Sequence, residues 1–197
     1  MAKFTWILIA AAGATAVAAV GAWAWSTQNV ETPDYTLEKA DGAIEIRRYP
    51  ALVIAKIEKA GNRGEAVRAA FSPLARYITA KERPGEKIAM TAPVTQGRDD
   101  DDWVVSFIMP SGRTLEDLPT PTGSVTLAEI PPRRVAAIRF SGRWTDDRFA
   151  EAKDRLMAWV SAQGLVPSGT PQYAYYNDPF TPPFLRRNEV LIDISVP

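Results

Sequence analysis

The side chains available for chemistry in this sequence are limited, because its 197 residues contain neither His nor Cys. His is the commonest general base and a frequent ligand of zinc and haem iron, and Cys supplies thiolate nucleophiles and metal ligands. A Ser-His-Asp triad is therefore excluded, and no glycine-rich phosphate loop is present. The acidic run at residues 99–102 is typical of a solvated turn. We expect no metal site and no catalytic residue.

Carboxylates, arginines and aromatic rings are the reactive or recognising groups that remain. Glu45 and Glu129 fall in segments that we expect to be strands, where burial would suit them to the acid–base chemistry of a carboxylate-dependent hydrolase. Arg186 and Arg187 stand close to Glu189, which indicates a structural ion pair or loop clamp more than a ligand site. A hydrolase is therefore kept as an alternative to a binding protein.

Charge and composition exclude further classes of function. Lys plus Arg and Asp plus Glu each number 23, so no net field would recruit nucleic acid or an anionic surface. The hydrophobic fraction of 46% is ordinary for a globular protein. The residues that follow the first 25 suffice for one domain with a single core.

The N-terminus has the pattern of a targeting or anchoring segment. Residues 4–25 are 22 residues without a charge, long enough to cross about 30 Å of hydrocarbon. Residues 22–24, Ala-Trp-Ala, resemble a signal cleavage site, whereas Trp23 and Trp25 favour an anchor at a membrane interface. We expect residues 1–26 to be a signal peptide or an N-terminal membrane anchor, with a buried core helix as the third reading. In the first two cases the domain is exported to the periplasm of a bacterial cell, anchored to the inner membrane if the segment is retained.

Hydrophobic periodicity predicts eight strands and two helices in the rest of the chain. Helices are expected over residues 62–81 and 146–164, and Pro73 should kink or split the first of them. The strands are expected over residues 43–50, 51–60, 86–96, 103–110, 125–132, 133–142, 173–176 and 189–196.

The order of these elements indicates an internal duplication. Pro50 and Pro132 precede comparable strands 82 residues apart, and Gly61 and Gly142 precede the two helices 81 residues apart. A duplicated strand-strand-helix-strand-strand unit predicts an α+β fold, a distorted, largely antiparallel eight-stranded barrel with two helices. Grooves between helix and strands would be places where ligands commonly bind.

Three stretches of the sequence resemble signatures of the SOUL/haem-binding-protein family. They are "KIAMTAPV" at residues 87–94, "FIMP" at 107–110, and "YNDPFTPPFLRRNEVLIDI" at 176–194. The resemblance covers residues 34–197, which it identifies as a SOUL-like haem-binding domain. It implies a pseudo-symmetric distorted barrel of two similar halves, in agreement with the duplication. It also implies that haem or another tetrapyrrole binds in a shallow apolar groove beside the first helix.

The absence of His determines how such a ligand would be held. Some relatives use a His as an iron ligand, and that mode is excluded here. What the resemblance leaves is non-covalent binding through apolar contacts and basic groups near the propionates. By chemistry alone, the candidate axial ligands are Met90, Met109, Met157 and the tyrosines.

The ligand-binding residues are then expected beside the first helix and on the equivalent strand of the second half. Arg63 and Arg68 would pair with propionates, or else lie on a solvated helix face. Met90 is expected to share a strand face with Ile88, and the tyrosines would stack on a planar ligand or pack in the core. The predicted set is Arg63, Val67, Arg68, Phe71, Leu74, Ile78, Met90, Tyr173 and Tyr175. The apolar helix residues among them, and Met90, have core packing as the alternative.

Three further functions compete with tetrapyrrole binding. The predicted barrel resembles the small-molecule effector domains of bacterial regulators, where a buried acidic group can meet a cationic ligand. A generic carrier of small hydrophobic ligands is therefore the first alternative, the hydrolase is the second, and a structural envelope protein is the third.

Overall fold

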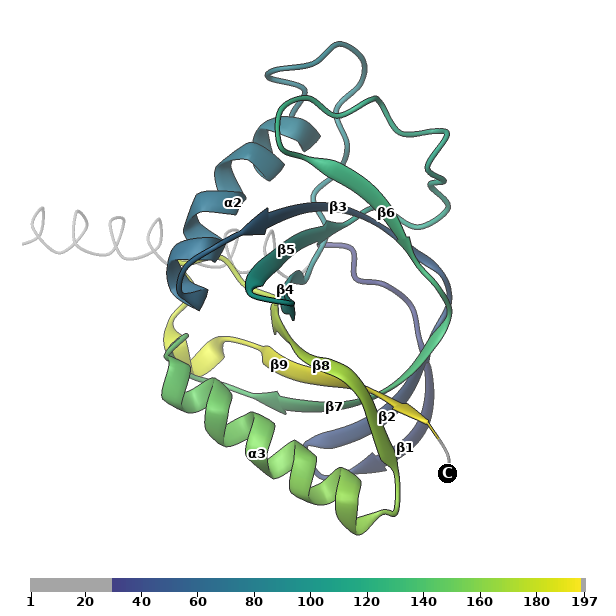
Figure 1. The fold of residues 1–197 in the computed structure, drawn as a ribbon, viewed down its shortest axis with the longest axis vertical. Helices are drawn as coiled ribbons and strands as arrows, with labels where there is room; N and C mark the ends of the chain where they lie inside the picture. Colours follow the sequence, from purple (N-terminus) through teal and green to yellow (C-terminus); the bar gives the residue numbers. More distant parts are fainter. Residues whose placement is uncertain (1–29, 196–197) are drawn as a thin grey trace, which may run out of the picture. The chain divides into compact units, whose positions relative to one another are not determined.

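The computed structural model describes residues 30–195, which form an α+β fold of nine strands and two helices with one short 3-10 turn (Figure 1). The first half of the chain contains β1 (Thr36–Asp41), β2 (Ile44–Tyr49), β3 (Leu52–Lys59), α2 (Arg63–Ile78), β4 (Val94–Asp99) and β5 (Asp102–Ile108). The second half contains β6 (Thr126–Ile130), β7 (Arg133–Phe140), α3 (Asp146–Ala162), β8 (Val166–Tyr175), η1 (Pro183–Leu185) and β9 (Asn188–Ser195).

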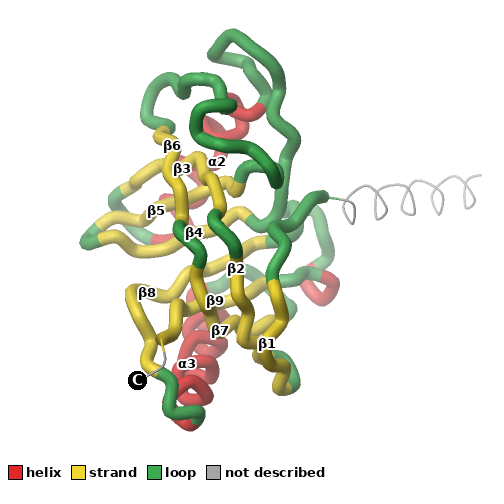
Figure 2. Tube along the Cα trace, turned by 90° about the vertical axis from the view of Figure 1, so that its right-hand side faces the viewer, coloured by secondary structure: helices red, strands yellow, loops and turns green. Residues whose placement is uncertain are grey.

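The strands form one antiparallel sheet in the order β1-β2-β7-β9-β8-β4-β5-β3-β6. Figure 2 shows its two edges, β1 beside β2 and β6 beside β3. The expected eight-stranded barrel is thus corrected on two points. The sheet has nine strands, because β1 adds to β2, and it is not closed into a barrel, because its order ends at β1 and β6.

Strand pairing is the same in the two halves. β5 lies between β4 and β3, as β9 lies between β8 and β7, and the halves meet where β4 pairs with β8. The first strand of each repeated unit, β2 or β6, pairs with a strand of the other unit, since β2 pairs with β7 and β6 pairs with β3. Each strand-strand-helix-strand-strand unit therefore adds its first strand to the strands of the other unit.

Both helices form where the periodicity predicts them. Asn62 caps α2, its side chain accepting a hydrogen bond from the Glu65 amide at 2.9 Å. Pro73 lies inside α2, which continues through it, so of the two expected outcomes, a kink or a split, the split does not occur. The carbonyl that a proline at this place leaves without an amide belongs to Ala69, which is exposed, so solvent can satisfy it.

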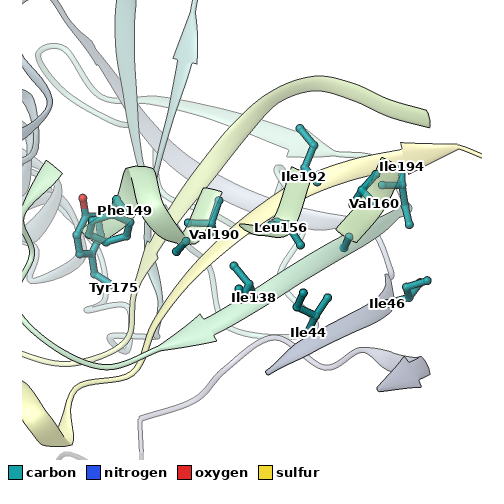
Figure 3. Packing of buried hydrophobic residues seen from close by; sticks show 12 residues of the cluster. Ile44, Ile46, Ile138, Phe149, Leu156, Val160, Tyr175, Val190, Ile192 and Ile194 are labelled. Carbon is teal, nitrogen blue, oxygen red and sulfur yellow. The ribbon is translucent and has the colours of Figure 1, made fainter. Parts of the chain in front are cut away.

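Each helix covers its own part of the sheet. α3 places Phe149, Leu156 and Val160 against Ile138 and Val190, as Figure 3 shows. α2 does the same over β3 and β5, where its buried side chains meet Ile57 and Val105 among others. A third, smaller cluster on the opposite face joins β2, β7, β8 and β9. The core therefore repeats with the chain, one helix to each half.

The segment before β4 differs most from its expected form. The predicted strand over residues 86–96 exists only from Val94 onward, after a cis Ala92–Pro93 bond, and residues 86–90 have no regular structure. β8 begins at Val166, earlier than the predicted residue 173.

The predicted signal peptide or anchor, residues 1–26, lies outside the residues that the structure describes. Among the described residues, no helix combines the length and hydropathy needed to cross a membrane.

Candidate functional site

The exposed edge of α2 carries the apolar side chains that sequence analysis singled out. Phe71 is 45% exposed, and its ring packs edge-on against Phe107 with centroids 5.4 Å apart. Val67, one turn earlier, is half-buried. An aromatic ring held on one side by a core ring and open on the other side offers a fixed apolar contact to a ligand.

This edge lies over the place where the two halves of the sheet meet. Val67 and Val94 each pack against both helix-covered clusters. Val94 pairs with Phe107 on one side and with Tyr175 on the other. A ligand lying against Phe71 would therefore contact α2 near the joint between β4 and β8.

Met90 is 39% exposed, and the segment that carries it is not the expected strand. It was expected to share a strand face with Ile88, and the structure corrects this, because neither residue is in a strand. Ile88 is only 4% exposed, and its amide donates to the carbonyl of Ile78 at 2.8 Å. This bond fixes the segment to the end of α2, and Met90 follows it out to the surface.

Arg63 is used inside the protein. Its guanidinium pairs with Asp146 of α3 (Nη2 to Oδ1, 2.5 Å), donates to the Tyr175 hydroxyl, and lies 4.5 Å from the Phe149 ring centroid. It is 8% exposed, so the alternative of a solvated helix face does not hold. Arg63 ties the first turn of α2 to the first turn of α3, and a propionate there would have to replace Asp146.

Arg68, by contrast, is exposed on α2. Its guanidinium extends along the helix toward Gly64, where an added Cβ would lie 3.5 Å from Nη1. Arg68 follows Gly64 by four residues and precedes Phe71 by three, and its guanidinium lies on the Gly64 side, so its pairing with a carboxylate at the apolar edge stays a prediction.

The other predicted residues are buried or half-buried. Leu74 is 0% exposed and Ile78 is 5% exposed, because both face the core between α2 and the sheet. Tyr173 is half-buried against Phe149. Tyr175 is 8% exposed, and its hydroxyl donates to Gln96 at 3.1 Å. Burial raises the pKa of Tyr175 to about 12, against the opposing effect of Arg63. Their role as direct ligand contacts stays a prediction.

Sequence reasoning did not assign the most exposed apolar side chains, which lie in the loop between β8 and β9. Phe180 is 85% exposed, Phe184 is 75% and Leu185 is 62%. The loop adjoins α2 through Trp144, whose carbonyl accepts from Arg63 at 3.3 Å and whose ring lies 4.1 Å from the Arg186 guanidinium. The signal that could have found them is the stretch "DPFTPPFL", where aromatic residues alternate with prolines that cannot continue a strand.

Met90 is the most accessible of the methionines considered as axial ligands. Met109 is 5% exposed and Met157 is half-buried against the α3 cluster. Within residues 30–195, no group of three or more acidic side chains converges as a metal site would require. The surface beside Phe71 fits the apolar body and the carboxylates of a porphyrin by the chemistry of its residues, which are apolar with a neighbouring guanidinium.

The carboxylate that the structure buries is Glu189, not Glu45 or Glu129. Glu129 is exposed, and Glu45 is half-buried and pairs with Arg47 at 2.6 Å. Glu189 is 0% exposed and accepts two bonds from Arg47, at 2.6 and 3.0 Å. Arg187 adds a contact at 2.8 Å, which confirms the ion pair expected from sequence.

The charge of Glu189 is thereby neutralised in place. Burial opposes its ionisation, but the hydrogen bonds and charges of Arg47 and Arg187 outweigh burial and keep its pKa below the ordinary value. Tyr176 also donates to it, at 2.9 Å. A carboxylate bound by two guanidinium groups and a phenol is poorly placed to act as a base or to receive a cationic ligand.

A separate hollow of about 490 Å³ lies at one end of β1, β2 and β7. Its lining includes apolar side chains, among them Tyr35 and Tyr49, together with Arg48 and Arg134, which both pair with the nearby Glu38, at 2.5 and 2.6 Å. Both arginines are thus already paired with a carboxylate, whereas Arg68 beside the apolar edge of α2 is exposed, so we take that edge as the candidate site.

The geometry defines a two-helix α+β domain of two similarly paired halves, with an exposed apolar edge where they join. The sequence matches the profile of a known family, the SOUL heme-binding protein family, over residues 30–193. The chain therefore belongs to the SOUL haem-binding protein family. No curated protein matches the sequence.

Solved structures with this fold include proteins of other functions. The C-terminal domain of EcmrR is similar with a TM-score of 0.57 and 14% identity, and the match covers 83% of this chain and 99% of that one. A protein from Listeria innocua described as a hydrolase has a TM-score of 0.53 and 14% identity, with 80% and 94% covered. At such identities the likeness concerns the fold alone.

Proposed function

We propose that this protein binds haem or a related tetrapyrrole non-covalently, in a shallow apolar groove beside α2 and without a His axial ligand. The observation that carries the proposal is the half-exposed Phe71, fixed against Phe107 at the joint of the two halves. Val67 extends this apolar surface by one turn of α2, and Met90, exposed before β4, would add to it. The loop between β8 and β9 contacts Trp144, whose carbonyl accepts from Arg63 in the first turn of α2.

Each group has a definite part in this proposal. The faces of the porphyrin would lie against apolar side chains, whose burial provides most of the affinity. Arg68 would pair with a propionate, because its guanidinium is exposed on the same helix. Arg63, Leu74, Ile78, Tyr173 and Tyr175 would hold the surface in shape from behind. The haem iron, when present, would provide its own redox and ligand chemistry.

A hemin titration tests the proposal. The contacts described above lie within residues 30–195, so a fragment of residues 27–197 retains the whole fold. Hemin added to this fragment should produce a shifted Soret band that saturates at one equivalent. A band that grows linearly, as with hemin in buffer, would contradict tetrapyrrole binding and favour a carrier of another hydrophobic ligand.

We do not propose catalysis. A carboxylate-dependent hydrolase would need a free buried acid, and Glu189 is instead bound to Arg47 and Arg187. The similarity to a protein described as a hydrolase concerns the fold and adds no site residue.

We further propose that the protein is exported to the periplasm, and that residues 4–25 anchor it in the inner membrane if they are retained. Under this proposal the partners are a small planar hydrophobic ligand and a membrane, with no nucleic acid.

A further inference from the structure

Three large apolar side chains project from one loop, residues 177–187 between β8 and β9. Phe180, Phe184 and Leu185 are the most exposed large hydrophobic residues among those that the structure describes, at 85%, 75% and 62%. Their proximity in six residues distinguishes them from isolated surface residues such as Leu37 or Val166. Clustered exposure of this kind indicates an interaction surface.

The loop is held in one conformation by its own hydrogen bonds. Asp178 accepts from the amides of Phe180 and Thr181, at 2.7 and 3.0 Å. Arg186 donates to the carbonyls of Thr181 and Pro179, both at 2.8 Å. The three apolar side chains are therefore displayed without further loss of backbone freedom on binding, which favours association.

The loop is also fixed to the rest of the domain. The amide of Gly142 donates to the carbonyl of Pro183 at 2.9 Å, while within the loop the amide of Arg187 donates to the Asn177 side chain at 2.6 Å and joins its two ends. The guanidinium groups of Arg186 and Arg187 lie on the rings of Trp144 and Tyr176, at 4.1 and 3.8 Å. Aromatic, Arg and aliphatic side chains together are the composition found where proteins meet the membrane interface.

The N-terminal end of the described chain leaves the sheet at the same end as this loop. Val94 pairs with Tyr175, and β4 and β8 are antiparallel (Figure 1). Residues just before Val94 therefore lie at the same end of the sheet as those just after Tyr175. Ala92 donates to the carbonyl of Glu31 at 2.8 Å, so Glu31 is attached at that end.

The chain before Glu31 limits how far this end can lie from a membrane. Only residues 26–30 separate the uncharged stretch 4–25 from Glu31. Six residue steps span at most about 20 Å when fully extended. If residues 4–25 are embedded in a bilayer, Glu31, which is attached at the end of the sheet from which the loop also leaves, can be no farther than this from the bilayer surface.

We propose that the loop of residues 177–187 docks on the lipid bilayer, with Phe180, Phe184 and Leu185 inserted among the headgroups and upper acyl chains. The inference rests on the proposed retention of the N-terminal anchor. It adds a second membrane contact that places the apolar edge of α2 next to the lipid, so that a hydrophobic ligand could pass between bilayer and protein with little exposure to water.

Site-directed spin labelling tests this on the full chain, which contains no Cys, so that a single introduced Cys is labelled uniquely. The probe position is Phe184→Cys, and the matched control is Val166→Cys, which is 45% exposed at the opposite end of β8. Both would be reconstituted in vesicles of phosphatidylethanolamine and phosphatidylglycerol. Collision with oxygen, which concentrates in lipid, is compared with collision with a water-soluble nickel chelate.

The label at position 184 should favour oxygen over the nickel chelate at least fivefold more than the label at position 166. Equal, aqueous values at both positions in vesicles that carry the chain would overturn the docking while leaving the anchor intact. A chain that fails to float with the vesicles would overturn both proposals. A label at position 184 that is immobilised and shielded from both reagents would indicate a second copy of the chain instead, and would also overturn bilayer docking.

Discussion

Replacing Phe71 by alanine should weaken tetrapyrrole binding about 5- to 30-fold. A phenylalanine side chain exposes about 200 Å² when free, and Phe71 retains 45% of its exposure. About 90 Å² is therefore open to a ligand. If the ligand covers between half and all of it, at about 25 cal/mol per Å², the loss is about 1–2 kcal/mol. Each 1.4 kcal/mol corresponds to a factor of ten in Kd.

The assay is the hemin titration of Phe71→Ala alongside Leu37→Ala. Leu37 is 52% exposed on β1, at an edge of the sheet remote in sheet order from the β4–β8 joint, and is the matched loss of exposed apolar surface. Urea unfolding of both variants corrects for stability, since Phe71 also loses its edge-on contact with Phe107, worth about 0.5–1.5 kcal/mol.

The reasoning fails if both variants bind hemin as the unmodified chain does, or if both lose the same affinity. The first outcome would place the ligand elsewhere, and the second would show only non-specific adsorption to exposed apolar surface.

Three further predictions concern charge and stability. Glu189→Gln should lower the free energy of unfolding by about 3–5 kcal/mol, because it removes the fully buried counter-charge of Arg47 and leaves that guanidinium only the half-buried Glu45. The depressed pKa of Glu189 gives stability that is present above the ordinary value of 4.5 and lost as the pH falls through the folded value, so denaturant unfolding from pH 6 downward should be less pH-dependent in Glu189→Gln. Arg68→Glu should weaken hemin binding with little change in stability. Arg63→Met should cost about 2–3 kcal/mol of stability and leave the hemin affinity of the folded protein nearly unchanged. The reverse pattern would make Arg63 the ligand contact and Arg68 the structural residue. The raised pKa of Tyr175 gives stability that is full below its ordinary value of 10.0 and lost as the pH rises through about 12, so Tyr175→Phe should flatten the fall of unfolding free energy over that window, and identical alkaline curves would refute this.

The repeated order of elements could be predicted from sequence because it depends on local signals. The face formed by Val67, Ala70, Phe71, Leu74 and Ile78 predicted α2, and the paired prolines and glycines predicted the second half. β1 was missed because "TLEKAD" is exposed throughout and has no apolar alternation to detect. The stretch 86–93 was taken for a strand because its apolar residues resemble one, but β4, and with it the strand ladder, begins only at Val94.

The candidate site could be predicted only in part, because several of its contacts join residues far apart in sequence. Phe71 and Arg68 were found because they lie on a periodic helix. The partner of Arg63, Asp146, is 83 residues away, and that of Arg47, Glu189, is 142 residues away. No spacing rule connects such pairs. The exposure of Phe180 and Phe184 likewise depends on a loop conformation set by Asp178 and Arg186.

The central claim is that apolar shape and burial, without an axial His, hold the tetrapyrrole beside Phe71. The most direct measurement compares hemin with metal-free protoporphyrin IX by titration of the same 27–197 fragment, following the Soret band of one and the fluorescence of the other. The two Kd values should agree within about threefold, because the apolar area covered is the same. Binding of hemin alone would contradict the claim, since it would mean that the iron, through a ligand such as Met90, carries the affinity.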